Sequence, residues 1–454
     1  MNDAKPISNQ RPAIARLLTA FGWGHRGSHG SRIATVILTI LLSLAFLNDL
    51  QISLRHGFDN VYQDFRIFHD AAVEFARHPH GPIYDTRPNY LYPPLFLVVF
   101  SPLLHLPDNV AMAVFQSLKW LALLLTLRLA WRLPAPPGER LPPVVVLGSL
   151  VLVWRYFTNE MLNGNINMFI LAGVLASVWL AQRRAFFAAG FLVALLAAIK
   201  VTPALILVFF VAKRFWRTIP GALAGLALGL LIWPGLALGW ENNWRLLGEW
   251  HHHVVGGFLS AGAVYSPAAN QGLAAWLNRL FTDAVAIEPD QRITLIHLPA
   301  AALTTLRTTL TLCVVAVLVW TWRPRRTHQT PALAAAAELS ITLIAMLVLS
   351  GYTWKAHYVA MLLPYTVLLA FLADARWSSP KRRRVAGWLI VSVVLMTLST
   401  EFAGPHIADL LMSYGVVLFS ALAAAAGLVE LLRINCIGPG QPALSGPPEA
   451  PTVA

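Results

Sequence analysis

Long apolar runs are the feature that most constrains how this chain can fold. Each run is about as long as a helix that crosses the hydrocarbon core of a bilayer. Only 12% of the 454 residues are charged, whereas roughly a quarter are charged in a soluble globular domain. The pattern predicts an all-α polytopic membrane protein. The runs are Ile33–Gln51, Val110–Trp131, Ala222–Gly239, Leu303–Trp322, Ala332–Ser350, Val385–Thr400 and Val416–Leu432.

Positive charge lies in short clusters beside these runs, for example Arg323–Arg326 and Lys381–Arg384. The net charge is +13, and clusters of this kind mark cytoplasmic loops. Interleaved basic and aromatic residues, which would indicate a nucleic-acid surface, do not occur outside the apolar runs. We therefore expect membrane lipids and no nucleic acid as partners, and a multi-pass protein of the cell inner (plasma) membrane.

The charge pattern predicts three parts of the chain. Residues 1–32 form a basic cytoplasmic N-terminus without a cleavage site, so the first apolar run is a retained anchor. Residues 33–433 form the transmembrane domain, with about 9–12 transmembrane or re-entrant helices. Within it, residues 53–92 form the first extracytoplasmic loop. Residues 434–454 are rich in Pro and Gly and form a disordered cytoplasmic tail.

Two apolar segments do not fit a simple series of crossings. Pro93–His105 is too short to span the bilayer as a helix. Phe186–Ala212 has arginines on both sides and is interrupted by Pro203. Both segments are interpreted as half-length hairpins, which are tolerated where they line a cavity or pack inside protein. One full crossing is the alternative for Phe186–Ala212.

Two ionisable residues stand out as candidates for chemistry. Asp64 follows the first apolar run and lies beside Phe65, in the predicted outer loop. A carboxylate held there can accept the proton of a sugar hydroxyl, although acids are also common in solvated loops. Lys200 lies in the middle of an apolar stretch, where a charge suggests function and phosphate is a natural partner. Snorkelling to the membrane surface is the alternative for Lys200.

Four further polar groups are predicted on the same outer face. Each has a purely structural explanation as well: a helix start, a helix-ending turn, an N-cap and an interfacial aromatic belt. Their common location favours a shared substrate site. The groups are Tyr92-Pro93-Pro94, Asn163–Asn167, Ser266–Gln271 and Trp354–Tyr358, and their candidate side chains are Tyr92, Asn165, Asn167, Asn270, Gln271, Trp354, Lys355 and His357.

The sequence offers no motif for a metal or a nucleotide cofactor. His251-His252-His253 is a poor chelate, because adjacent residues do not share a helix face. Two cysteines, Cys313 and Cys436, cannot build a metal cluster. A Walker motif and a GxGxxG motif are both missing. We therefore expect neither a metal nor a cofactor.

The order and spacing of these motifs resemble glycosyltransferase family 87. The series is Asp64, YPPL from Tyr92, NGNIN from Asn163, AAIKVTP around Lys200, NQGL from Asn270 and SGYTWKAHYVAMLLP up to Pro364. The resemblance covers about Ile33 to Arg384. The chain departs from the family's usual GQxN, NQSL and WxHH motifs, which leaves the sugar and the acceptor open.

The resemblance implies a GT-C-like helical bundle, as in polyprenyl-phosphate-mannose-dependent mannosyltransferases. It implies inverting transfer of a hexose, expected to be mannose, from a polyprenyl-phosphate donor to a lipid or glycan acceptor outside the membrane. Asp64 would be the general base of this hexosyltransferase. Lys200, Lys355 and His357 would hold the donor phosphate.

Two other functions remain open from the sequence alone. One is a transporter or flippase for a lipid-linked saccharide, although transporters often contain internal repeats and none is visible here. The other is a non-catalytic subunit of an envelope polysaccharide system, in which Asp64 would be replaceable.

Overall fold

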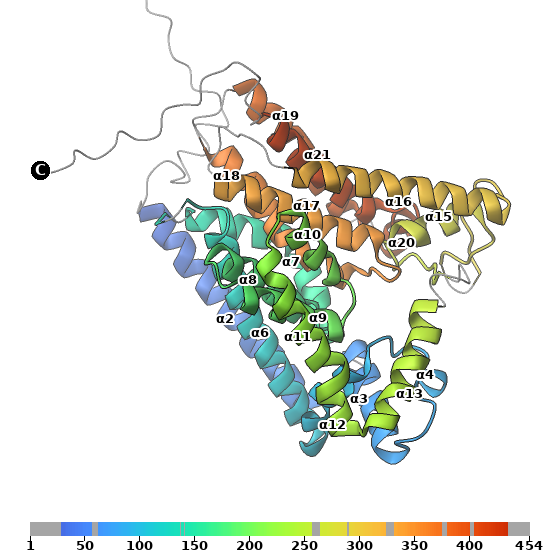
Figure 1. Cartoon of the computed structure of the whole chain (residues 1–454). Helices are drawn as coiled ribbons and strands as arrows, with labels where there is room; N and C mark the ends of the chain where they lie inside the picture. Colours follow the sequence, from blue (N-terminus) through green and yellow to red (C-terminus); the bar gives the residue numbers. More distant parts are fainter. Residues whose placement is uncertain are drawn as a thin grey trace, which may run out of the picture.

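A computed structural model describes most of the chain between residues 29 and 434. The described residues are 29–56, 62–136, 138–139, 141–256, 264–287, 290–323, 331–374, 379–399 and 404–434. The predicted tail from residue 435 on and most of the predicted N-terminus lie outside them. The described ranges are built of helices and contain no β-strand (Figure 1). The protein is an all-α polytopic membrane protein, as predicted.

The helices vary widely in length, and three short ones extend their neighbours: η2 (Trp216–Thr218) precedes α11, η3 (Ala227–Ile232) joins α11 to α12, and η4 (His251–Gly256) follows α13. In chain order the others are α2 (His29–His56), α3 (Gln63–Arg77), α4 (Ile83–Thr86), α5 (Pro94–Phe100), η1 (Ser101–His105), α6 (Asp108–Arg132), α7 (Pro143–Asn163), α8 (Asn167–Gln182), α9 (Phe186–Ile199), α10 (Ala204–Ala212), α11 (Ile219–Leu226), α12 (Trp233–Leu238), α13 (Trp240–Trp250), α15 (Leu273–Phe281), α16 (Ala300–Trp322), α17 (Pro331–Leu349), η5 (Lys355–Met361), α18 (Leu362–Ala373), α19 (Ser379–Leu398), α20 (Pro405–Ser413) and α21 (Val416–Ile434).

Six helical segments of the described chain are long and apolar enough to cross a membrane. Five of them match runs predicted from the sequence. The sixth, Lys355–Ala373, is not among the predicted runs, because Lys355, His357 and Pro364 interrupt its apolar pattern. The segments are Asp108–Arg132, Trp216–Leu238, Ala300–Trp322, Pro331–Leu349, Lys355–Ala373 and Val416–Arg433.

Helices α9 and α11 pack closely and run parallel to each other. A Cβ at Gly221 would lie 2.0 Å from the carbonyl oxygen of Phe187, so only glycine allows this approach. Further along, Gly225 faces Phe191 and the continuation of α11 at Gly229 faces Ala198. Because α9 and α11 are parallel, the chain must run back in the opposite direction between them, and α10 is the helix that runs back. Residues 186–212 therefore form a helical hairpin and not one full crossing.

The short helices of the predicted outer loop lie at one end of the molecule, together with α13. Helices α3, α4 and α13 lie together at the bottom of the view in Figure 1, far from the start of α2. At the far side, α16 lies at the periphery and exposes apolar side chains such as Leu312 and Val319. Such a surface is expected where lipid is the solvent.

Candidate functional site

The candidate site begins at the short turn between α7 and α8. Helix α7 ends at Asn163 and is followed by Gly164 as its C-cap, whose φ of 64° and ψ of 30° are left-handed, as is common at this position. A Cβ at this position would lie 2.8 Å from the Cβ of Phe65 in the first turn of α3. Glycine is needed here for its backbone angle and for the close approach of α3. The NGNIN stretch thus ends one helix and docks another.

This docking brings Asp64 against Asn165. The Tyr62 N–H donates to the carbonyl of Leu162 at 2.9 Å, and Asn165 Nδ2 donates to Asp64 Oδ2 at 2.5 Å. The Ile166 N–H donates to Asn165 Oδ1 at 2.7 Å, which determines which way the amide points. The partly buried carboxylate of Asp64 is therefore held from one side, through Oδ2.

Burial raises the pKa of Asp64 above the ordinary value for aspartate. The hydrogen bond from Asn165 and the positive charges of Lys200 and Lys119 act in the opposite direction and lower this pKa, but burial is the largest effect. A carboxylate whose pKa lies closer to neutral accepts a proton more readily than an exposed one. The environment of Asp64 therefore suits a general base.

A second group of polar atoms surrounds Lys200, which lies at the turn between α9 and α10. Its Nζ donates to Asn167 Oδ1 at 2.7 Å and lies 2.9 Å from His357 Nε2. The same atom lies 5.7 Å from the ring centroid of Tyr92. The structure thus brings together four residues that the sequence analysis selected from four separate segments.

At the contact between Lys200 and His357, an N–H group of the lysine faces the N–H group of the histidine ring. The Trp354 N–H donates to His357 Nδ1 at 3.1 Å, so a neutral ring carries its hydrogen on Nε2, the atom that faces Lys200. An ammonium group cannot donate to a nitrogen that already carries a hydrogen. An anionic oxygen placed beside this pair would accept from both residues.

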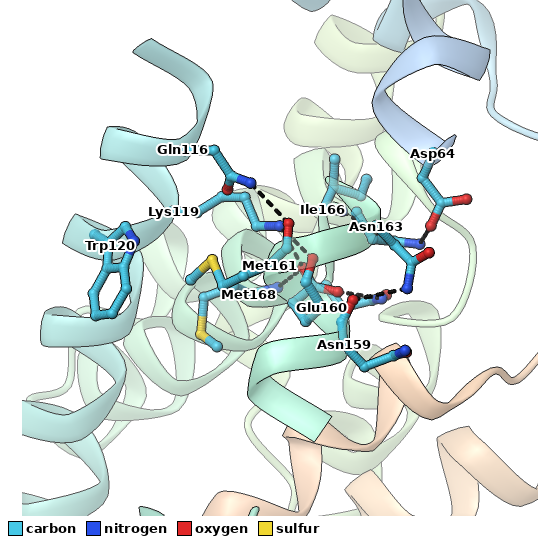
Figure 2. A network of polar contacts seen from close by, with 12 residues as sticks. Asp64, Gln116, Lys119, Trp120, Asn159, Glu160, Met161, Asn163, Ile166 and Met168 are labelled. Carbon is cyan, nitrogen blue, oxygen red and sulfur yellow. Dashed lines mark hydrogen bonds and ion pairs between the residues drawn. The ribbon is translucent and has the colours of Figure 1, made fainter. Parts of the chain in front are cut away.

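Two buried charges behind these residues were missed by the sequence analysis (Figure 2). Lys119 on α6 and Glu160 on α7 are both fully buried. The Lys119 Nζ donates to the Glu160 carbonyl at 2.6 Å and lies 3.6 Å from Glu160 Oε1. Glu160 Oε2 accepts from Asn167 Nδ2 at 3.0 Å. Each is an ionisable residue within an apolar helix, the same signal that selected Lys200, and it could have been used for them too.

Asn270 and Gln271 do not point toward Lys200 but bind the backbone of their own surroundings. The Asn270 amide donates to the carbonyls of Tyr265 and Gly351 and accepts from the N–H groups of Gly272 and Thr353. Gln271 Nε2 donates to two further carbonyls. For Ser266–Gln271 the alternative explanation was an N-cap; in the structure Gly272 is the N-cap of α15 and no side chain caps the helix.

The two other candidates before α18 also point elsewhere. Lys355 Nζ donates to the carbonyl of Ser399 at 3.2 Å. The ring of Trp354 stacks on Tyr265, with 6.2 Å between ring centroids and an angle of 15° between planes. Of the three predicted phosphate-binding cations, the structure therefore brings together Lys200 and His357 but not Lys355.

The space beside the lysine–histidine pair is narrow. A cavity of about 40 Å³ is lined by Asn167 and His357, and otherwise mostly by apolar residues of α8 and α17. A larger cavity, of about 500 Å³, is formed by residues 74–86 and contains none of the site residues. No group of three His, Cys, Asp or Glu side chains in the described part of the chain is placed to hold a metal ion.

An all-helical membrane protein with a buried carboxylate and a lysine–histidine pair at its helix ends has the parts of a membrane transferase. The sequence profile of Glycosyltransferase family 87 matches residues 90–351, which is more than half of the chain. The chain belongs to this family and is a glycosyltransferase.

Two curated relatives from Mycobacterium tuberculosis are similar to the chain. A polyprenol-phosphate-mannose-dependent alpha-(1-2)-phosphatidylinositol mannoside mannosyltransferase is 29% identical over 331 residues, which cover 70% of this chain and 69% of the relative. A polyprenol-phosphate-mannose-dependent alpha-(1-2)-phosphatidylinositol pentamannoside mannosyltransferase is 24% identical over 360 residues, which cover 76% of this chain and 74% of the relative. No solved structure gives a significant match.

Proposed function

We propose that this glycosyltransferase moves mannose from a polyprenyl-phosphate donor to a glycolipid acceptor. The observation that carries the proposal is the pair of Lys200 and His357, whose nitrogens lie 2.9 Å apart at the turn between α9 and α10. The names of both relatives include the same donor and a phosphatidylinositol mannoside acceptor. We place the reaction on the outer side of the cell inner membrane, because the basic clusters favour the opposite side for the cytoplasm.

In this proposal the donor phosphate binds beside Lys200 and His357. The Lys200 ammonium and the His357 Nε2–H both donate to phosphate oxygens. Hydrogen bonds to an ionised acceptor are shorter and stronger than neutral ones. They also strengthen as negative charge develops on the departing phosphate. The ammonium of Lys200 and the N–H of His357 thereby stabilise the leaving group.

Asp64 acts as the general base for the acceptor. Its free oxygen takes the proton of the attacking hydroxyl, and that oxygen forms a bond to the anomeric carbon of mannose. The bond between this carbon and the phosphate breaks on the opposite face, which inverts the configuration. The products are the mannosylated acceptor, polyprenyl phosphate and protonated Asp64, which returns its proton to solvent.

The turn between α7 and α8 connects the two halves of this chemistry. Asn165 contacts the base and Asn167 contacts the lysine, and the two are only two residues apart. The ring of Tyr92, next to Lys200, would form one wall of the site. Trp354 would contact sugar, and Asn270 and Gln271 would support the loop that carries it. Lys355 would not contact the phosphate, because its Nζ donates to the carbonyl of Ser399.

Transfer of radiolabelled mannose tests the function. Purified protein in liposomes is given labelled polyprenyl-phosphate mannose and a phosphatidylinositol mannoside, and the lipids are then separated. We expect label in a larger glycolipid for the wild type and none for Asp64→Ala. Transfer from a nucleotide sugar alone, or movement of the donor across the bilayer without a new glycosidic bond, would contradict the proposal.

A further inference from the structure

We propose that Glu160 is a positioning residue for glycosyl transfer, because it orients the amide of Asn167 and thereby places the ammonium group of Lys200. This inference rests on the proposed function, in which Lys200 holds the donor phosphate. Glu160 lies one layer behind the site, at the end of α7. It contacts none of the proposed reacting groups directly, and acts on them through Asn167.

The direction of the Asn167 amide depends on Glu160. Glu160 Oε2 accepts from Asn167 Nδ2 at 3.0 Å, so the oxygen of the same amide points toward Lys200, whose Nζ donates to it at 2.7 Å. A rotation of the amide by half a turn would present N–H groups to an ammonium group. Only the observed orientation matches a donor with an acceptor at both contacts.

The other oxygen of Glu160 is also held. Oε1 accepts from the Met168 N–H at 3.1 Å and lies 3.6 Å from Lys119 Nζ. Both side chains of this ion pair are fully buried. A buried carboxylate needs such partners to remain charged. Glu160 is therefore fixed as an acceptor at both oxygens. On one side the donors run from Lys200 to Asn167 and from Asn167 to Glu160, and on the other side Lys119 faces Glu160 as its ion-pair partner.

Glu160→Gln breaks this chain whichever way the new amide points. If its oxygen faces Met168, its NH₂ group faces Asn167 Nδ2, and the Asn167 amide has to turn its own NH₂ group toward Lys200. If its oxygen faces Asn167, its NH₂ group faces the Met168 N–H and Lys119, which are both donors. The shape of the side chain is unchanged in this variant, so the loss is one of hydrogen-bond direction.

Exchanging the positions of the carboxylate and the amide restores a donor opposite an acceptor at every contact. In the double variant Glu160→Gln with Asn167→Asp, the introduced glutamine accepts from Met168 and donates to the introduced aspartate. That aspartate then accepts from Lys200. The net charge of the pair is the same as in the wild type. Asn167→Asp alone places two carboxylates next to each other and is expected to fail.

The experiment measures kcat and the donor KM for these variants with polyprenyl-phosphate mannose, on monodisperse protein with a measured Tm. We expect each single variant to raise the donor KM about tenfold to a hundredfold, the effect of losing a hydrogen bond to a charged group. The double variant should recover most of this loss. Ser149→Ala, a buried polar change on the same helix, should lower Tm at most and leave the KM unchanged.

A Lys200→Met background separates this inference from the proposed function. If Lys200→Met raises the donor KM and Glu160→Gln adds nothing further in that background, Glu160 acts through Lys200. If Lys200→Met raises the KM but the Glu160→Gln effect is additive, or the double exchange recovers Tm and not KM, the positioning role is wrong. If Lys200→Met leaves the donor KM unchanged, the phosphate role of Lys200 fails first.

Discussion

Asp64 and Asn165 show how a neighbouring residue adjusts the pKa of the proposed base. Burial raises the pKa of Asp64, and the hydrogen bond from Asn165 lowers it in part. Activity requires ionised Asp64 in the proposed mechanism, so activity is lost as the pH falls through this raised pKa. The acid limb of the pH–rate profile therefore reports on the surroundings of Asp64.

Asn165→Ala should move that acid limb to higher pH. Without the hydrogen bond that favours the charged form, the pKa of Asp64 rises further. The measurement is the pH dependence of kcat for the wild type and the variant. Asn163→Ala is the matched control, because Asn163 Nδ2 donates to the Asn159 carbonyl and not to Asp64. An acid limb that stays in place, or moves to lower pH, would show that Asn165 does not act on the base.

Helix ends, more than helix faces, assemble the site. The end of α7, the start of α8, the α9–α10 turn and the start of η5 converge around Lys200, as the contacts of Asn167 and His357 with its Nζ show. The sequence indicated the apolar elements well, because spanning helices need long apolar runs. It left open whether residues 186–212 form the α9–α10 hairpin or one crossing. Apolar periodicity does not reveal that α9 and α11 pack side by side in parallel, which requires the chain to turn back through α10. The sequence shows the glycines that allow this packing, but only the structure shows which backbone each of them contacts.

Close packing of α9 against α11 should make Gly190→Ala destabilising. A Cβ at Gly190 would lie 2.0 Å from the carbonyl oxygen of Thr218, and backbone cannot move aside as a side chain does. We expect a loss of about 1–3 kcal/mol, typical of overpacking, seen as a lower Tm in detergent. Gly387→Ala on α19 has nothing within 4 Å of the new Cβ and should be neutral or slightly stabilising. Equal Tm values for both variants would contradict this packing.

At the scale of the whole molecule, the sequence predicted the site in part. Asp64, Tyr92, Asn165, Asn167, Lys200 and His357 come together, because motifs at element ends on one face meet there. Glu160 and Lys119 were missed, although an ionisable residue within an apolar helix is the signal that selected Lys200; only the structure shows that the two residues pair between α6 and α7. Asn270 and Gln271 donate hydrogen bonds to backbone carbonyls and do not reach the candidate site. The sequence cannot show this, because it does not give the direction of a side chain.

The predicted orientation in the membrane can be tested by cysteine labelling. In a background without Cys313 and Cys436, single cysteines replace the exposed residues His80 and Gln182. A membrane-impermeant reagent should label His80→Cys in intact cells, and Gln182→Cys only after the membrane is opened. This follows from the basic residues beside Gln182. The reverse labelling pattern would place the site on the cytoplasmic side.

The central claim, that Asp64 is the base and Lys200 holds the phosphate, is tested most directly by comparing kcat and donor KM in matched variants. Asp64→Asn should lower kcat by about 10²–10⁴-fold, typical of a lost general base, with little change in donor KM. Lys200→Met should raise the donor KM instead. Asp70→Asn, which changes a surface acid 3.9 Å from Arg66, should be near neutral. Wild-type kcat in Asp64→Asn would contradict the account.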